Sequence, residues 1–212
     1  MPSCRAIRPQ LSFLKPENVA QVHDASLEIL SSVGVRLDSP TAWEIFDRDA
    51  RVRREGRRAY LAPELVEEAL QSAPSTIDIY DQEGARSFQL GVGEAHFGVG
   101  VTALFYQDPD SEETVPFTRD RFRSMVRLGE RLSSFDVVST VGIIQDLPPE
   151  VADLYAVLEM AANTTKSLVV LVSDEERFED CLRLLTHLRG DLRHRPFVIP
   201  YFNPISPLVI NA

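Results

Sequence analysis

From Thr118 onward, helical patterns alternate with short, continuously apolar runs, and this rhythm restricts the fold more than any other feature of the chain. The runs cover residues 137–144, 168–172 and 197–202. Short strands without polar alternation are buried on both faces, which is typical of parallel sheets, and strands separated by helices form βαβ units. The sequence therefore predicts an α/β fold, and residues 99–106 offer one possible earlier strand.

The predicted strands are too few for a closed barrel, which requires eight. The chain stops at Ala212, just after an apolar strand and before any further helix. A natural domain seldom ends at such a point, because the apolar strands would lack covering layers. We therefore expect a partial TIM (β/α)8 barrel over residues 118–212, which is either truncated or completed by a partner.

Residues 1–117 predict a different, α+β region made of helices and hairpins. Apolar residues at helical spacing predict a helix over residues 19–33, and Ser39-Pro40 is typical of the start of a second helix. Residues 51–61 predict a short hairpin, and residues 77–117 predict further β structure. The expected inner faces are Trp43, Phe46 and Ala50 on the second helix, and Val66, Ala69 and Leu70 on a third that begins at Pro63.

Charge and composition exclude several classes of function. The net charge of -10 opposes binding to nucleic acids and to anionic membranes. The two cysteines have no metal-binding spacing, and the arginines of residues 51–58 favour a solvated hairpin. No apolar run reaches the roughly 18 residues of a membrane span, and the amino terminus lacks the apolar core of a signal peptide. We expect a cytoplasmic protein.

No phosphate-binding loop, zinc-protease motif, hydrolase nucleophile motif or kinase motif is present, and the four histidines are scattered. Position is the remaining guide, because functional residues of parallel α/β folds follow the carboxyl ends of strands. This rule selects residues that follow the three apolar runs: Gln145 and Asp146, then Ser173 and Asp174, then Asn203, Pro204 and Ser206. Asp146 and Asp174 could equally cap the following helices.

The last of these segments is the strongest candidate for substrate binding. Two prolines fix the backbone around Asn203 and Ser206, although a rigid turn is an alternative reading. Tyr201 and Phe202 lie beside them, and aromatic faces attract quaternary ammonium groups, although aromatic residues in strands more often fill a core. We assign substrate binding to Asn203, Ser206, Tyr201 and Asp146, and no catalytic residue.

Several segments, in this order and spacing, resemble the trimethylamine methyltransferase family. They are residues 22–35, 61–70, 73–74, 118–120, 165–168 and 203–208. The resemblance implies a TIM barrel that transfers a methyl group from trimethylamine, glycine betaine or a similar amine to the cobalt of a separate corrinoid protein. Members are about twice as long, and some carry pyrrolysine at a position that would follow Ala212. The resemblance implies no directly bound cofactor, since the corrinoid is carried by the partner.

Two classes of function follow. The first is an enzyme: the amino-terminal part of a corrinoid-dependent amine methyltransferase, inactive by itself. Methyl transfer to cobalt(I) requires the protein to orient and desolvate the amine, which agrees with the missing motifs, and an acidic chain suits a cationic substrate. The second is a non-catalytic half-barrel, either a binding and assembly module or a gene fragment. We also expect a homo-oligomer.

Overall fold

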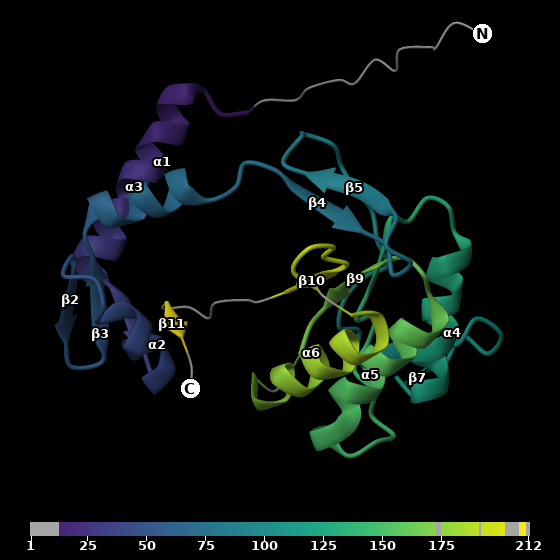
Figure 1. Ribbon diagram of the computed structural model, residues 1–212. Coiled ribbons are helices and arrows are strands. Elements are labelled where there is room, and N and C mark those ends of the chain that lie inside the picture. Colours follow the sequence, from purple (N-terminus) through teal and green to yellow (C-terminus); the bar gives the residue numbers. More distant parts are fainter. Residues whose placement is uncertain (1–12, 173–174, 191, 202–207, 211–212) are drawn as a thin grey trace, which may run out of the picture. The chain divides into compact units, whose positions relative to one another are not determined.

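The computed structural model describes residues 13–172, 175–190, 192–201 and 208–210, and the chain forms two compact units. The first combines Met1–Ala73 with Asn203–Ala212, and the second is Pro74–Phe202. Both mix helices and strands, and no closed barrel occurs among the described residues (Figure 1). The boundary predicted at residues 117 and 118 lies within the second unit.

The first unit contains a four-stranded sheet in the order β11-β1-β3-β2 with three flanking helices. Its elements are α1 (Pro16–Glu28), β1 (Val35–Leu37), α2 (Pro40–Phe46), β2 (Val52–Glu55), β3 (Arg58–Leu61), α3 (Pro63–Ser72) and β11 (Val209–Ile210). The core is Leu37, Trp43 and Ala59. The predicted cap of α2 is confirmed, because the Ser39 side chain accepts a hydrogen bond from the amide of Ala42 at 3.3 Å.

Three details of this unit differ from the prediction. The predicted helix over 19–33 begins at Pro16, and its last turn, Ile29–Val33, is a π-helix that ends at Gly34 with φ +69°. Ala50 lies outside α2, because the helix ends at Phe46. Ala69 and Leu70 were predicted to face inward but are exposed, since only one side of the short helix α3 has neighbours to pack against.

The arginines of the β2–β3 hairpin are largely neutralised by carboxylates within the unit. Their ion pairs are Arg51 with Asp49 and Glu68, Arg53 with Glu55, Arg54 with Asp47, and Arg57 with Asp38. Two guanidinium groups also stack on aromatic rings, Arg53 on Tyr60 at 4.0 Å and Arg54 on Trp43 at 3.9 Å. The hairpin is therefore not a field of unpaired positive charge that would attract a polyanion.

The second unit is built on parallel strands, as the apolar runs predicted. Strands β8 (Val137–Ser139), β9 (Ser167–Val170) and β10 (Val198–Pro200) are parallel neighbours in chain order. Residues 97–103 run parallel to β8 through bridges from Gly98 to Val137 and from Ala103 to Gly142. Four parallel backbone segments thus lie in sequence order. The possible strand over residues 99–106 is present only in part, because residues 98–103 pair with β8 through two isolated bridges and Phe105–Gln107 form an antiparallel hairpin strand instead.

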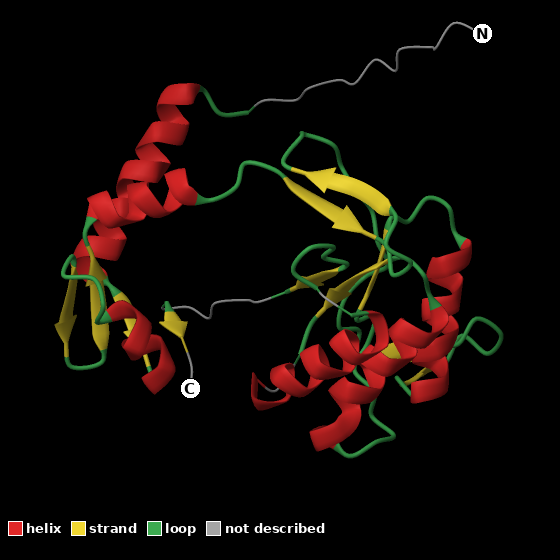
Figure 2. Ribbon diagram, in the orientation of Figure 1, coloured by secondary structure: helices red, strands yellow, loops and turns green. Residues whose placement is uncertain are grey.

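Helices connect these strands and cover one face of the sheet (Figure 2). The remaining elements are β4 (Ile77–Tyr80), β5 (Arg86–Leu90), β6 (Phe105–Gln107), β7 (Thr114–Pro116), α4 (Arg119–Arg131), α5 (Pro149–Asn163) and α6 (Glu175–Arg189). The fully buried residues beneath the helices include Val138, Leu168 and Val170 from the strands. Burial of each such side chain contributes about 1.5–3 kcal/mol.

The opposite, inner face of the sheet is partly covered by the β4–β5 hairpin. Ile79 and Phe88 of the hairpin pack with Val137, and Val169 and Ile199 lie against the same cluster. Buried Gln82 at the hairpin tip donates two hydrogen bonds, to the carbonyl of Thr164 at 2.7 Å and of Lys166 at 3.2 Å. These contacts hold the tip of the hairpin at the amino ends of the strands, so it does not cover their carboxyl ends.

Candidate functional site

The carboxyl ends of the four parallel segments form one edge of the sheet, because neighbouring parallel strands end on the same side. This is the edge at which ligands bind in open α/β sheets. The residues that follow the strand ends, and that the structure describes, include Leu104, Gln145, Leu171 and Tyr201. We take this edge as the candidate site.

Hydrogen bonds between the strand ends hold this edge in place. The amide of Thr102 donates to the carbonyl of Thr140 at 2.8 Å, and the hydroxyl of Thr140 accepts from the amide of Leu171 at 3.0 Å. The Gln145 side-chain amide donates to the carbonyl of Leu104. Three of the four strand ends are thereby connected, and such mutual support is what a preorganised binding site requires.

Two predicted substrate residues lie among the described residues. The backbone amide of Tyr201 donates to the carbonyl of Val170 at 2.9 Å, so Tyr201 directly extends the parallel pairing of β10 with β9, and it is 43% exposed. Asp146 is exposed and accepts a hydrogen bond from the amide of Arg119 at 2.8 Å. Asp146 therefore caps the preceding helix α4, whereas the capping alternative placed it on the following helix, whose N-cap is Pro148.

The other candidate residues cannot be placed. Asn203, Pro204 and Ser206 lie outside the described residues, as do Ser173 and Asp174. Their assignment to substrate binding stays a prediction, and the same holds for the role of Tyr201 and Asp146. The described edge itself holds an aromatic strand end, an exposed carboxylate and the side-chain amide of Gln145.

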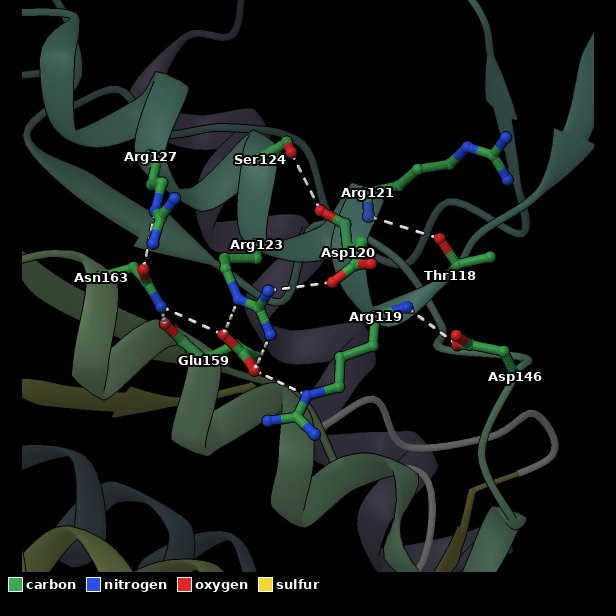
Figure 3. A network of polar contacts seen from close by, with 10 residues as sticks. All are labelled: Thr118, Arg119, Asp120, Arg121, Arg123, Ser124, Arg127, Asp146, Glu159 and Asn163. Carbon is green, nitrogen blue, oxygen red and sulfur yellow. Dashed lines mark hydrogen bonds and ion pairs between the residues drawn. The ribbon is translucent and has the colours of Figure 1, made fainter.

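A network of charged side chains joins α4 to α5 and reaches Asp146 through the backbone of Arg119 (Figure 3). The carboxylate of Glu159 is 5% exposed, and it binds the Arg119 guanidinium at 2.6 Å and the Arg123 guanidinium at 2.7 Å. Asn163 donates a further hydrogen bond to the same carboxylate at 3.1 Å. Arg119 thus contacts Asp146 through its backbone and Glu159 through its side chain.

These hydrogen bonds stabilise the ionised carboxylate. The bond from Arg123 is the largest cause that lowers the pKa of Glu159 to about 2, and Arg119 adds to it, while burial opposes the shift. The guanidinium of Arg119 also lies 4.3 Å above the ring of Tyr155. The network fixes the first turn of α4, to which Asp146 is bonded, and so supports the candidate edge.

Sequence reasoning missed Glu159. It lies in the apolar stretch Ala156-Val157-Leu158-Glu159-Met160-Ala161 of the helix that follows Pro148. A carboxylate inside such a stretch requires a cationic partner when it is buried. That signal was available, but the sequence alone does not say which arginine provides the partner.

An apolar groove of about 520 Å³ lies beside this edge, on the outer, helix-covered side of residues 97–103. Val101, Ala103 and Phe105 line it from one side and Met125 and Leu128 from α4. Within the described parts of the chain, no group of three or more His, Cys, Asp or Glu side chains could hold a metal ion. None of the helices there is long and apolar enough to cross a membrane.

Comparison with known proteins decides the family. The model of the family described as trimethylamine methyltransferase (MTTB) matches residues 1–212. The chain belongs to this family. A trimethylamine methyltransferase of Desulfitobacterium hafniense is 30% identical over 207 residues, which cover 94% of this chain and 41% of the relative. The family resemblance predicted from the sequence is thereby confirmed.

Two further relatives of this chain carry the names of amine methyltransferases. A glycine betaine methyltransferase of Desulfitobacterium hafniense is 24% identical over 204 residues, covering 94% of this chain and 42% of the relative. A trimethylamine methyltransferase of Methanosarcina barkeri is 25% identical over 215 residues, covering 96% and 43%. The chain therefore spans about two fifths of the length of the curated relatives it matches.

Proposed function

We propose that this chain is the amino-terminal part of a methyltransferase that moves a methyl group from a methylated or quaternary amine to the corrinoid of a separate protein. In this proposal, residues 97–103, β8, β9 and β10 are the first four strands of a (β/α)8 barrel. The observation that carries it is the succession of four parallel segments, with their carboxyl ends on one edge, in a chain of this family.

The edge residues would bind and orient the amine rather than react with it. In the reaction, a carbon–cobalt bond forms while the carbon–nitrogen bond breaks, and the departing amine keeps the electron pair. The exposed carboxylate of Asp146 and the partly exposed ring of Tyr201 would both attract the cationic nitrogen. Substrate binding by Asn203 and Ser206, which lie outside the described residues, stays a prediction from the sequence.

We expect the isolated chain to be inactive, because a barrel site draws residues from the ends of several strands. The test is complementation with the three fifths of the Desulfitobacterium hafniense trimethylamine methyltransferase that this chain does not match. Both pieces are produced together, and methyl transfer from trimethylamine or glycine betaine is followed by the absorbance change of the corrinoid protein. Turnover that requires both pieces supports the proposal.

A substitution at Asn203 tests the predicted role of this residue in substrate binding. Asn203→Ala in the complemented enzyme is expected to lower methyl transfer by roughly tenfold or more, the loss of about one good polar contact. Asn18→Ala in the first turn of α1 is the control and leaves the rate unchanged. If the pieces associate but no amine is demethylated, the enzymatic proposal fails, and unchanged turnover of the Asn203 variant removes that residue from the site.

One observation favours the alternative, a non-catalytic half-barrel that acts as an assembly module. Several large apolar side chains along the sheet edge and the groove are exposed, among them Val101, Leu104, Phe105 and Leu128. Contiguous apolar surface of this kind is typical of proteins that associate. A stable dimer of the purified chain in light scattering, without activity on complementation, supports the alternative.

A further inference from the structure

The backbone at Thr102 is in the left-handed region, with φ +53°. Among the described non-glycine residues with such a φ, Thr102 is the one with a β-branched side chain, for which this conformation is a true outlier. At Glu112 the same conformation belongs to the tip of the β6–β7 hairpin, where turns commonly require it. Thr102 lies instead at the carboxyl end of a parallel segment, so a hairpin turn does not explain its left-handed backbone.

The contacts around Thr102 show that this conformation is held in place. Its amide donates to the carbonyl of Thr140 at 2.8 Å, and the next amide, of Ala103, donates to the carbonyl of Val141 at 3.1 Å. The Gln145 side chain then binds the carbonyl of Leu104. Strain of this kind persists where its surroundings fix it, and it concentrates at binding and catalytic sites.

The side chain of Thr102 faces away from the helix-covered side. Because Val101 and Ala103 on either side of it line the apolar groove beside α4 and Thr102 does not, the threonine side chain is directed away from the groove. It is partly buried, and its hydroxyl has no hydrogen-bond partner in the described part of the chain.

We propose that Thr102 is a substrate-contacting residue of the amine site, and that the strained backbone aims its hydroxyl at the bound amine. This inference rests on the proposed function. The fitting ligand is a methylated amine with a hydrogen-bonding group, either the N–H of a tertiary ammonium or the carboxylate of a betaine. A fully quaternary ion without such a group, tetramethylammonium, offers the hydroxyl no partner.

The test compares Thr102→Val, which keeps the branched shape and removes the hydroxyl, with the unaltered chain, each combined with the complementing piece described above. NMR titrations at millimolar concentration use trimethylammonium, glycine betaine and tetramethylammonium. We expect the variant to bind trimethylammonium or glycine betaine about tenfold more weakly, the value of one hydrogen bond, and tetramethylammonium unchanged. Thr114→Val on exposed β7 is the control and alters none of the three.

A second variant measures the strain itself. Thr102→Gly is expected to raise the melting temperature by about 2–4 °C while it weakens binding of the same amines. Glu112→Gly at the hairpin tip also relieves a left-handed residue but leaves binding unchanged. A lower melting temperature for Thr102→Gly would show that the conformation serves the fold, and it would overturn the inference.

The two proposals fail in distinguishable ways. If the unaltered chain binds an amine and Thr102→Val binds it equally well, the inference about Thr102 is wrong and the proposed function stands. If the unaltered chain, combined with the complementing piece, binds none of the three amines, the assignment of an amine site to this edge is wrong, and the role of Thr102 fails with it.

Discussion

Substitution of Glu159 by glutamine tests whether the network between α4 and α5 stabilises the protein through charge. Glutamine keeps the shape and the polar atoms of the side chain but cannot carry the negative charge that Arg119 and Arg123 contact at 2.6 and 2.7 Å. The carboxylate is almost fully buried at 5% exposure. Removal of the charge leaves two guanidinium groups without their common partner.

The size of the effect follows from the pKa of Glu159, which is lowered from 4.5 to about 2. At about 1.4 kcal/mol per pKa unit, the shift corresponds to at most about 3 kcal/mol of folding free energy. The side chains of Arg119 and Arg123 are 32% and 31% exposed, so water screens part of this interaction. We therefore expect Glu159→Gln to lower the free energy of unfolding by about 1–2 kcal/mol at pH 7.

The lowered pKa of Glu159 also predicts how the stability difference between the two proteins changes with pH. A carboxyl group with a depressed pKa stabilises the folded state above its unfolded pKa, and this stabilisation is lost as pH falls toward the folded value. The difference between the unaltered protein and Glu159→Gln should therefore be largest above about pH 5 and shrink toward pH 2. Urea unfolding followed by circular dichroism at several pH values measures it.

Glu150→Gln is the matched control, because Glu150 is an exposed carboxylate in the first turn of the same helix. We expect this change to alter stability by less than about 0.5 kcal/mol. The reasoning is refuted if Glu159→Gln costs the same at pH 7 and at pH 3, or if the two substitutions are equally destabilising.

Three further substitutions test the packing and hydrogen bonds of the two units by urea unfolding. Gly142→Ala places a methyl group 2.7 Å from the ring of Phe117 and should cost about 1–3 kcal/mol, whereas Gly100→Ala meets no atom within 4 Å. Gln82→Ala removes both hydrogen bonds to the loop before β9 and should cost about 1–3 kcal/mol; a neutral result would mean that water satisfies those carbonyls. Ser39→Ala removes the cap of α2 and should cost about 1 kcal/mol, while Ser39→Thr should largely preserve stability.

The parallel strands could be predicted because a strand that is buried on both faces has apolar side chains at consecutive positions. Val138, Leu168 and Val170 lie under helices, and the opposite face also meets apolar neighbours, so the runs contain few polar residues. Helix starts at Ser39 and Thr118 were equally local, since each hydroxyl accepts a bond from an amide three residues later. The exposure of Leu70 was not predictable, because it depends on which elements pack against α3.

The sequence suggested which strand ends to consider for the candidate site but not the contacts of their residues. The strand-end rule selected Asp146, and the aromatic character of Tyr201 beside Asn203 selected that residue; the structure shows how each is bonded. The contact between Asp146 and the amide of Arg119 joins residues far apart in the sequence, and nothing local to Asp146 indicates it. The pairing of Glu159 with Arg119 and Arg123 has the same origin, because it depends on how α4 and α5 pack.

The pairing of β11 with β1 has a consequence for how the protein is made. Arg36 pairs with Val209 and Leu37 with Ile210, so the first unit takes an outer strand from residues synthesised long after its other strands. The second unit is encoded between these pieces and is complete on the ribosome before β11 emerges. Since domains generally fold as units during synthesis, the first sheet must wait with an open edge beside β1 until β11 is added.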